Sequence, residues 1–143
     1  MATGFGWQPP DACVKVDRTD AVGGEGCVAT KRVTVRNQTR GTDLGDLELR
    51  DGYLGRLRGL LGRRSLAPGD GIVISPCSSV HMFFMLLSLD VVYLDRDRRV
   101  VKTVSRLRPF AVSLGGRGAR ITLELPTGTI ASSGTQTGDT IAW

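Results

Sequence analysis

Short runs in which apolar and polar residues alternate, each bounded by turn-forming residues, recur from residue 31 to residue 143. A period of two predicts strands with one buried face, and the bounding glycine, proline and asparagine residues predict turns. The predicted strands lie at 31–37, around 47–49, and at 88–95, 99–106, 121–126 and 138–143, and two apolar runs at 71–76 and 77–87 are predicted as further strands. Short strands of this kind together with one helix predict an α+β, mainly β fold, a compact small domain like a β-barrel.

One segment has the period of a helix rather than that of a strand. In "GYLGRLRGLLGRRSL", residues 52–66, apolar residues recur at helical spacing and form a single stripe. Asp51 can cap the start of this segment, and Arg63 and Arg64 complement the helix dipole at its end. The sequence therefore predicts one short amphipathic helix packed on the barrel.

The stretch "PCSSVHMFFMLLSLD", residues 76–90, is apolar on both faces if it is extended. A strand with two apolar faces is expected to be covered on both sides, either within a small barrel or beneath the helix. We therefore predict a core strand over residues 77–87.

The first thirty residues are rich in glycine and proline and show no sustained periodicity. We predict that residues 1–30 form a partly disordered extension and that residues 31–143 form a single domain. Cys13 and Cys27 lie in this extension and could form a disulfide bond. No apolar run approaches the roughly 20 residues of a membrane helix. The start of the chain shows no signal peptide, which favours a cytoplasmic protein; an exported form whose leader has been removed is the alternative.

The charge balance is basic, with 19 lysine and arginine residues against 14 acidic ones and a net charge of +5. Sixteen of the basic residues are arginine, a bias that genomic base composition also produces. Because these charges are dispersed along the chain and interleaved with acids, nucleic-acid binding is not the favoured function.

Three motifs resemble a known family. "RLRGLLGRRSL", "HMFFMLLSLDVVYLDRD" and "LELPTG", followed by "GD" near the end, occur in the order and spacing of the DUF192 (UPF0127) proteins. The resemblance implies that family's mainly β barrel with one helix packed on it, and a family with no established biochemical activity. The chain departs from the family pattern at Leu86, where a polar or basic residue is usual, at Ser88, where proline is common, and at Arg98, where glycine usually ends the turn.

The residues needed for familiar catalytic or metal sites are not found together. Cys77 and His81 could act as nucleophile and base, but four residues of strand span about 13 Å, which is beyond hydrogen-bond reach. One cysteine and one histidine also give fewer ligands than a zinc site needs. We therefore predict no catalytic residue, no metal site and no cofactor, and we interpret both side chains as parts of the core strand.

Asp90 is a carboxylate in an otherwise apolar strand, and a buried carboxylate requires partners. Backbone amides, or an arginine such as Arg56, would make it a structural lock; a functional acid is the alternative. "GGRGAR" could wrap an anion with Arg117 and Arg120, although a connecting loop is the simpler interpretation. The candidate ligand-binding residues are Asp90, His81, Arg56, Arg117 and Arg120.

The leading functional hypothesis is a non-enzymatic binding or accessory domain whose partner is a protein, a peptide or a small ligand. The alternative is an enzyme that acts on an anionic or carbohydrate-like substrate through Asp90, His81 and nearby arginines. The third is weak nucleic-acid binding through the dispersed arginines.

Overall fold

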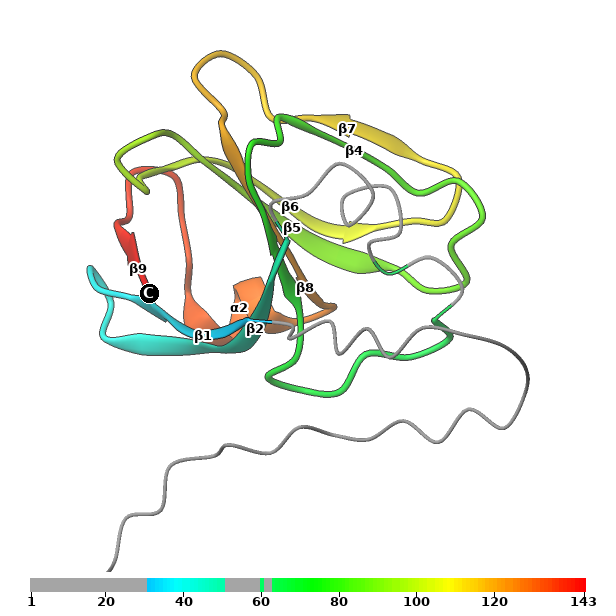
Figure 1. Ribbon diagram of the computed structural model, residues 1–143, viewed down its shortest axis with the longest axis horizontal. Coiled ribbons are helices and arrows are strands. Elements are labelled where there is room, and N and C mark those ends of the chain that lie inside the picture. Colours follow the sequence, from blue (N-terminus) through cyan, green and yellow to red (C-terminus); the bar gives the residue numbers. More distant parts are fainter. Residues whose placement is uncertain (1–30, 51–59, 61–62) are drawn as a thin grey trace, which may run out of the picture.

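The computed structural model describes residues 31–50, 60 and 63–143, and within these residues nearly all of the regular secondary structure is strand. Figure 1 shows a strongly curled sheet, a half-barrel, with a two-stranded ribbon, β4 and β7, at the top of the view. The strands are β1 (Arg32–Asn37), β2 (Thr42–Arg50), β3 (Ile72–Ile74), β4 (Ser79–His81), β5 (Leu89–Leu94), β6 (Val100–Leu107), β7 (Val112–Leu114), β8 (Ile121–Pro126) and β9 (Ile141–Ala142). The predicted mainly β, barrel-like fold is confirmed.

The large sheet has seven strands in the order β6-β5-β8-β3-β2-β1-β9. Neighbouring strands are antiparallel except β2 and β3, which run parallel. β8 lies between β5 and β3, so it joins the β5–β6 hairpin to the strands that precede it in the chain. The last strand, β9, pairs with β1, the first strand of the described residues.

The two faces of this sheet carry two apolar clusters, because successive side chains of a strand point to opposite faces. Along β5, Val92 belongs to one cluster, whereas Val91 and Tyr93 belong to the other. All three of these side chains have no exposed surface. The first cluster also contains Ile130 of the short helix α2 (Thr129–Ser133), which packs near β2 and β6.

The helix predicted over residues 52–66 falls mostly outside the described residues. The predicted extension, residues 1–30, lies entirely outside the described residues, and so do Cys13 and Cys27. Leu60 is described and is buried in the second cluster, as expected for a residue of the apolar stripe. The segment "TGTIASSG" contains the short helix α2.

The predicted long core strand over residues 77–87 is wrong. Only Ser79–His81 forms a strand, and β4 pairs with β7 alone, outside the large sheet. The chain then turns: the N–H of Met85 donates to the carbonyl of Met82 at 3.2 Å, and Phe84 adopts a left-handed φ of 60°. The turn buries the two methionines and leaves Phe83 and Phe84 exposed, so apolar composition here does not mean burial.

Candidate functional site

Asp90 lies in β5, and only 1% of its surface is exposed. Its Oδ1 accepts a hydrogen bond from the backbone N–H of Arg106 at 2.9 Å. Its Oδ2 accepts hydrogen bonds from the backbone N–H groups of Gly128 at 3.0 Å and Ile130 at 2.9 Å. Backbone amides therefore occupy both oxygens of this carboxylate.

Each of the three donors is a backbone amide that has no acceptor within its own strand pairing or helix. Arg106 belongs to a bulge, since β5 and β6 pair Leu89 with Leu107 but Val91 with Val104, which sets two residues of β6 against Asp90. Gly128 and Ile130 lie at the start of α2, where the first amides have no intrahelical acceptor. This is the geometry of a structural lock. Arg56, the other partner considered for Asp90, lies outside the described residues, and a ligand-binding role for Asp90 stays a prediction.

His81 and Cys77 have separate surroundings. The imidazole of His81 is exposed and stacks on Phe83, with ring centroids 5.4 Å apart. The thiol of Cys77 donates instead to the carbonyl of Ser79 at 3.1 Å. In the described part of the chain no hydrogen bond joins His81 to Cys77 or to the buried carboxylate of Asp90.

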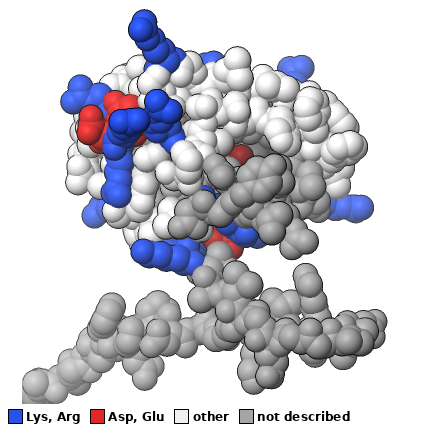
Figure 2. All heavy atoms as spheres, turned by 45° about the horizontal axis from the view of Figure 1, so that its top comes forward, with Lys and Arg blue, Asp and Glu red and all other residues white. Residues whose placement is uncertain are grey.

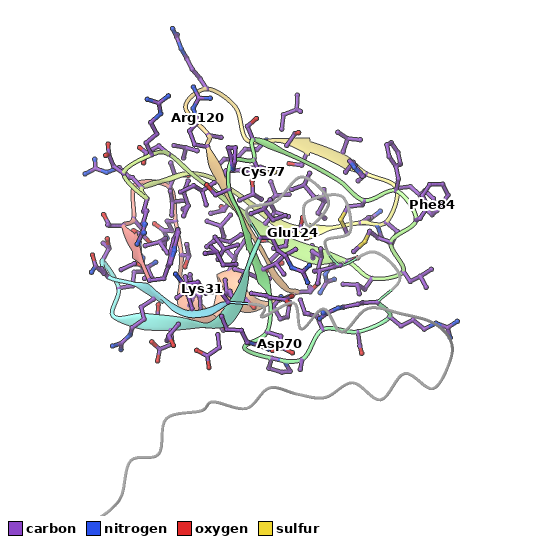
Figure 3. The ribbon with its side chains drawn as sticks, in the orientation of Figure 1. Lys31, Asp70, Cys77, Phe84, Arg120 and Glu124 are labelled. Carbon is purple, nitrogen blue, oxygen red and sulfur yellow. The ribbon has the colours of Figure 1, made fainter. Side chains whose placement is uncertain are left out.

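Arg117 and Arg120 lie in the loop that joins β7 to β8, and both are exposed. The backbone of Arg120 is tied down, because its N–H donates to Leu94 and its carbonyl accepts from Cys77, both at 2.7 Å. Figure 3 shows the side chain of Arg120 at the upper edge of the molecule, away from Glu124 near the centre. The predicted candidates thus do not converge on one pocket of the described residues.

Among the described residues, no group of three or more histidine, cysteine, aspartate or glutamate side chains is placed to hold a metal ion. None of the helices in this part of the chain is long and apolar enough to cross a membrane.

The most conspicuous surface of the described residues is apolar. Six large hydrophobic side chains are exposed, and all lie on β7 or on the turns beside the β4–β7 ribbon. They are Phe83, Phe84, Leu86, Phe110, Val112 and Leu114, and together they are called the apolar rim below. Two hydrogen bonds of 2.8 Å, from Phe110 N–H to Met82 and from Met82 N–H to Ala111, hold the two turns side by side.

The backbone of the apolar rim is held in a costly conformation. Phe84 and Phe110 have φ values of 60° and 62°, a left-handed region that bulky side chains rarely adopt. Their rings meet edge to face, with centroids 6.4 Å apart. Phe84 is 74% exposed, and Figure 3 shows it at the outer edge of the molecule, pointing away from the core. Strain of this kind, kept where it presents apolar groups to solvent, is typical of binding surfaces.

The charges around the apolar rim have one sign. Residues 76–89 and 102–120, which comprise the ribbon, its turns and most of β6, contain no aspartate or glutamate. They contain Lys102, Arg106, Arg108, Arg117 and Arg120, all of them exposed. In Figure 2, which brings the top of Figure 1 forward, much of the upper right surface is white, with blue side chains at its margin.

Glu124 is a buried carboxyl that the sequence analysis did not single out. It lies on β8, is 8% exposed, and makes no hydrogen bond to the described residues. Burial raises the pKa of its carboxyl to about 7. The sequence "ITLELP" places leucines on one face and Glu124 on the other, and the structure adds that β3 and β5 flank the strand on both sides.

Glu124 shares its face of the sheet with a small group of charged side chains. The register pairs it with Ile72 of β3, which in turn pairs with Glu48 of β2. Glu48 Oε2 accepts a hydrogen bond from Arg50 Nη2 at 2.7 Å, and Arg63 Nη2 lies 3.9 Å from the same oxygen. The buried Nε of Arg50 has no acceptor among the described residues. Arginine therefore balances the charge of Glu48, whereas burial favours the protonated form of Glu124.

Comparison with known proteins identifies relatives over most of the chain. The sequence model of DUF192, described as "Uncharacterized ACR", matches residues 33–143. A UPF0127 protein of Thermococcus sibiricus is 35% identical over 116 residues, which cover 75% of this chain and 72% of that protein. A UPF0127 protein of Thermococcus gammatolerans is 36% identical over 115 residues, with the same two shares covered.

A solved structure has the same fold. The crystal structure of a protein of unknown function from Novosphingobium aromaticivorans superposes with a TM-score of 0.72. It is 22% identical in sequence, and the match covers 87% of this chain and 94% of that one. At this identity the likeness concerns the fold alone, whereas the family match and the archaeal relatives carry the assignment. The chain belongs to the DUF192 family, the family of the UPF0127 proteins.

Proposed function

We propose that this domain is a non-enzymatic binding module that contacts its partner through the apolar rim. The observation that carries the proposal is the gathering of all the exposed large hydrophobic side chains of the described residues on the β4–β7 ribbon and its turns. Scattered exposed apolar residues are ordinary, but a contiguous group of them on a folded domain marks a surface that is covered by something else.

The conformation of the apolar rim supports the same function. A left-handed phenylalanine costs on the order of 1 kcal/mol, and the described residues include two of them, Phe84 and Phe110. Glycine at either position would remove that cost, and polar side chains would suit the solvent better. The aromatic side chains are therefore explained by a partner rather than by the stability of the isolated domain.

The enzyme hypothesis built on Asp90, His81 and nearby arginines gains no comparable support. Both oxygens of Asp90 accept backbone hydrogen bonds, and the ring of His81 stacks on Phe83 at the surface. A catalytic acid or base needs a free proton-transfer path to a substrate, and the carboxylate of Asp90 is buried and held by three backbone amides.

Site-specific photo-crosslinking in living cells tests the proposal. Phe84 is replaced by benzoylphenylalanine, and the same analogue replaces Gln38, an exposed residue in the turn between β1 and β2, as the control. We expect position 84 to give a discrete adduct on irradiation, position 38 to give none, and the additional change Leu86→Ser to weaken the adduct. Equal labelling from both positions, or no adduct with either protein or lipid from position 84, would contradict a binding role for the apolar rim.

A further inference from the structure

The apolar rim combines exposed hydrophobic side chains with cations and lacks acids. We propose that its partner is the surface of an anionic lipid bilayer, on which the domain sits with Phe84, Leu86 and Phe110 inserted at the level of the headgroups. This inference rests on the binding role proposed for the apolar rim and names the partner of that same surface.

The first argument is the shape of the surface. Phe84 and Phe110 stand on tight turns, and they are 74% and 64% exposed. Side chains that project in this way need a concave, matching surface on a protein partner. A bilayer makes no such demand, because its headgroup region closes around any apolar side chain that enters it. Phenylalanine and leucine are among the apolar residues through which surface-bound proteins enter this region.

The second argument is the distribution of charge. Arg108 opens the turn that carries Phe110, since its carbonyl accepts the N–H of Ala111 at 3.2 Å, and Arg106 precedes it by two residues. Both arginines are exposed, and no aspartate or glutamate of the described residues forms an ion pair with either. Lys102 lies beside the ribbon, because its Nζ donates to the carbonyl of Leu114 at 2.7 Å. Cations placed next to inserting apolar groups are the combination that binds anionic lipid.

The same charges argue against the simplest competing partner. A second copy of the chain would bring one apolar rim against another, and the flanking arginines of the two copies would face like charges. An acidic protein partner would satisfy the charges but would require a shape that receives two projecting aromatic turns. An anionic bilayer complements the positive charge and also accommodates the two projecting aromatic turns.

Co-sedimentation of the full chain with sucrose-loaded vesicles tests the inference. Vesicles of phosphatidylcholine alone are compared with vesicles that also contain phosphatidylglycerol, at low and at high salt. We expect binding to the anionic vesicles, much weaker binding to the neutral ones, and a loss of binding as salt screens the arginines. Light scattering of the protein without vesicles shows whether it is monomeric.

Matched variants separate the contributions. Phe84→Ser with Leu86→Ser should lower the partition coefficient about tenfold or more, because each side chain contributes apolar area to the membrane. Arg106→Gln and Arg108→Gln should each lower it about fivefold. Arg96→Gln makes the same charge change at an exposed position of the β5–β6 turn, away from the rim, and should have an effect of less than about twofold.

Phe84→Gly distinguishes a binding role from a structural one. Glycine adopts the left-handed conformation of residue 84 freely, so the melting temperature should be kept or raised while vesicle binding falls. A variant that loses both together would show that Phe84 supports the fold instead.

The outcomes also separate this inference from the proposed function. No binding to anionic vesicles, or binding that the rim variants leave unchanged, would overturn the lipid inference. A dimer that dissociates in the Phe84→Ser, Leu86→Ser variant would replace the bilayer by a second copy. A protein adduct from position 84, without vesicle binding, would retain the binding role and reject the bilayer. Failure of both experiments would reject the rim as a binding surface.

Discussion

The carboxylate of Asp90 and the backbone N–H of Ile130 are joined by a hydrogen bond of 2.9 Å across 40 residues of sequence. Together with the amides of Gly128 and Arg106, this bond makes one side chain the acceptor for the start of α2 and for the bulge of β6. A strand, a bulge and a helix are thereby fixed by a single residue, which explains why a charged side chain is kept in an otherwise apolar strand.

Removal of this carboxylate should destabilise the domain. We expect Asp90→Ala to lower the free energy of unfolding by about 2–4 kcal/mol, because three buried amides lose their acceptor. Asp90→Asn keeps one carbonyl oxygen but points an NH₂ group at the remaining donors, so its cost should be smaller, about 1–2 kcal/mol. Urea denaturation measures both values. A stable asparagine variant that had lost a binding activity would favour the functional acid instead.

The buried carboxyl of Glu124 should make stability depend on pH. Its pKa of about 7 lies above the ordinary value of 4.5, so between these values the folded protein holds a proton that the unfolded chain releases. The free energy of unfolding should therefore fall as pH rises from 4.5 to 7 and level off above, a total of about 3 kcal/mol.

Glu124→Gln removes this titration while keeping the shape of the side chain. The variant should unfold at a similar urea concentration to the parent near pH 4.5, and it should become the more stable protein by pH 8. Parallel pH profiles for the two proteins would show that Glu124 has a partner that stabilises its charged form.

Asp139 should make the free energy of unfolding fall as pH is lowered, the opposite of the effect of Glu124. Its Oδ2 accepts hydrogen bonds from Arg40 Nε, Asn37 Nδ2 and the Gln136 N–H, all at 2.9 Å, and the arginine first of all lowers the pKa of this carboxyl to about 2 from its ordinary 3.8. This stabilisation is complete above pH 4 and is lost as pH falls through 2. We expect Asp139→Asn to cost roughly 1–2 kcal/mol at neutral pH, since Arg40 is partly exposed, and to flatten the acid limb of the profile.

The turn between β5 and β6 offers a test of backbone strain. Arg98 has a φ of 61°, and its guanidinium lies 3.9 Å from the ring centroid of Trp143 and donates to the carbonyl of that residue at 2.7 Å. Alanine at position 98 would lose these contacts and keep the strain, whereas glycine would lose only the contacts. Arg98→Gly should therefore be more stable than Arg98→Ala by about 1 kcal/mol in thermal unfolding. At Arg96, where φ is not left-handed, the alanine variant should instead be more stable than the glycine variant.

The strands were predictable from the sequence where apolar and polar residues alternate, as in β1 and β8. The stretch after His81 was not, because Met82 and Phe83 are equally apolar, and only the pairing of β4 with β7 decides which of them is buried. The sequence predicts that Asp90 is bound by backbone amides or by an arginine. It does not identify the amides, because they belong to a bulge in β6 and to the start of α2, and no local sequence pattern predicts the bulge or the position of the helix. Glu124 was overlooked because alternation alone does not tell whether the polar face of a strand meets water.

The place of β8 in the sheet has a consequence for how the chain is made. β8 lies between β3 and β5, and it is the strand that connects the β1–β2–β3 group to the β5–β6 hairpin. While residues 121–126 are still inside the ribosome, the nascent chain therefore holds two separate pieces of sheet, each with an open and strongly apolar edge. Such edges pair readily with other chains. The domain should consequently fold only at the end of its own translation, and until then it should depend on chaperones that shield exposed strand edges.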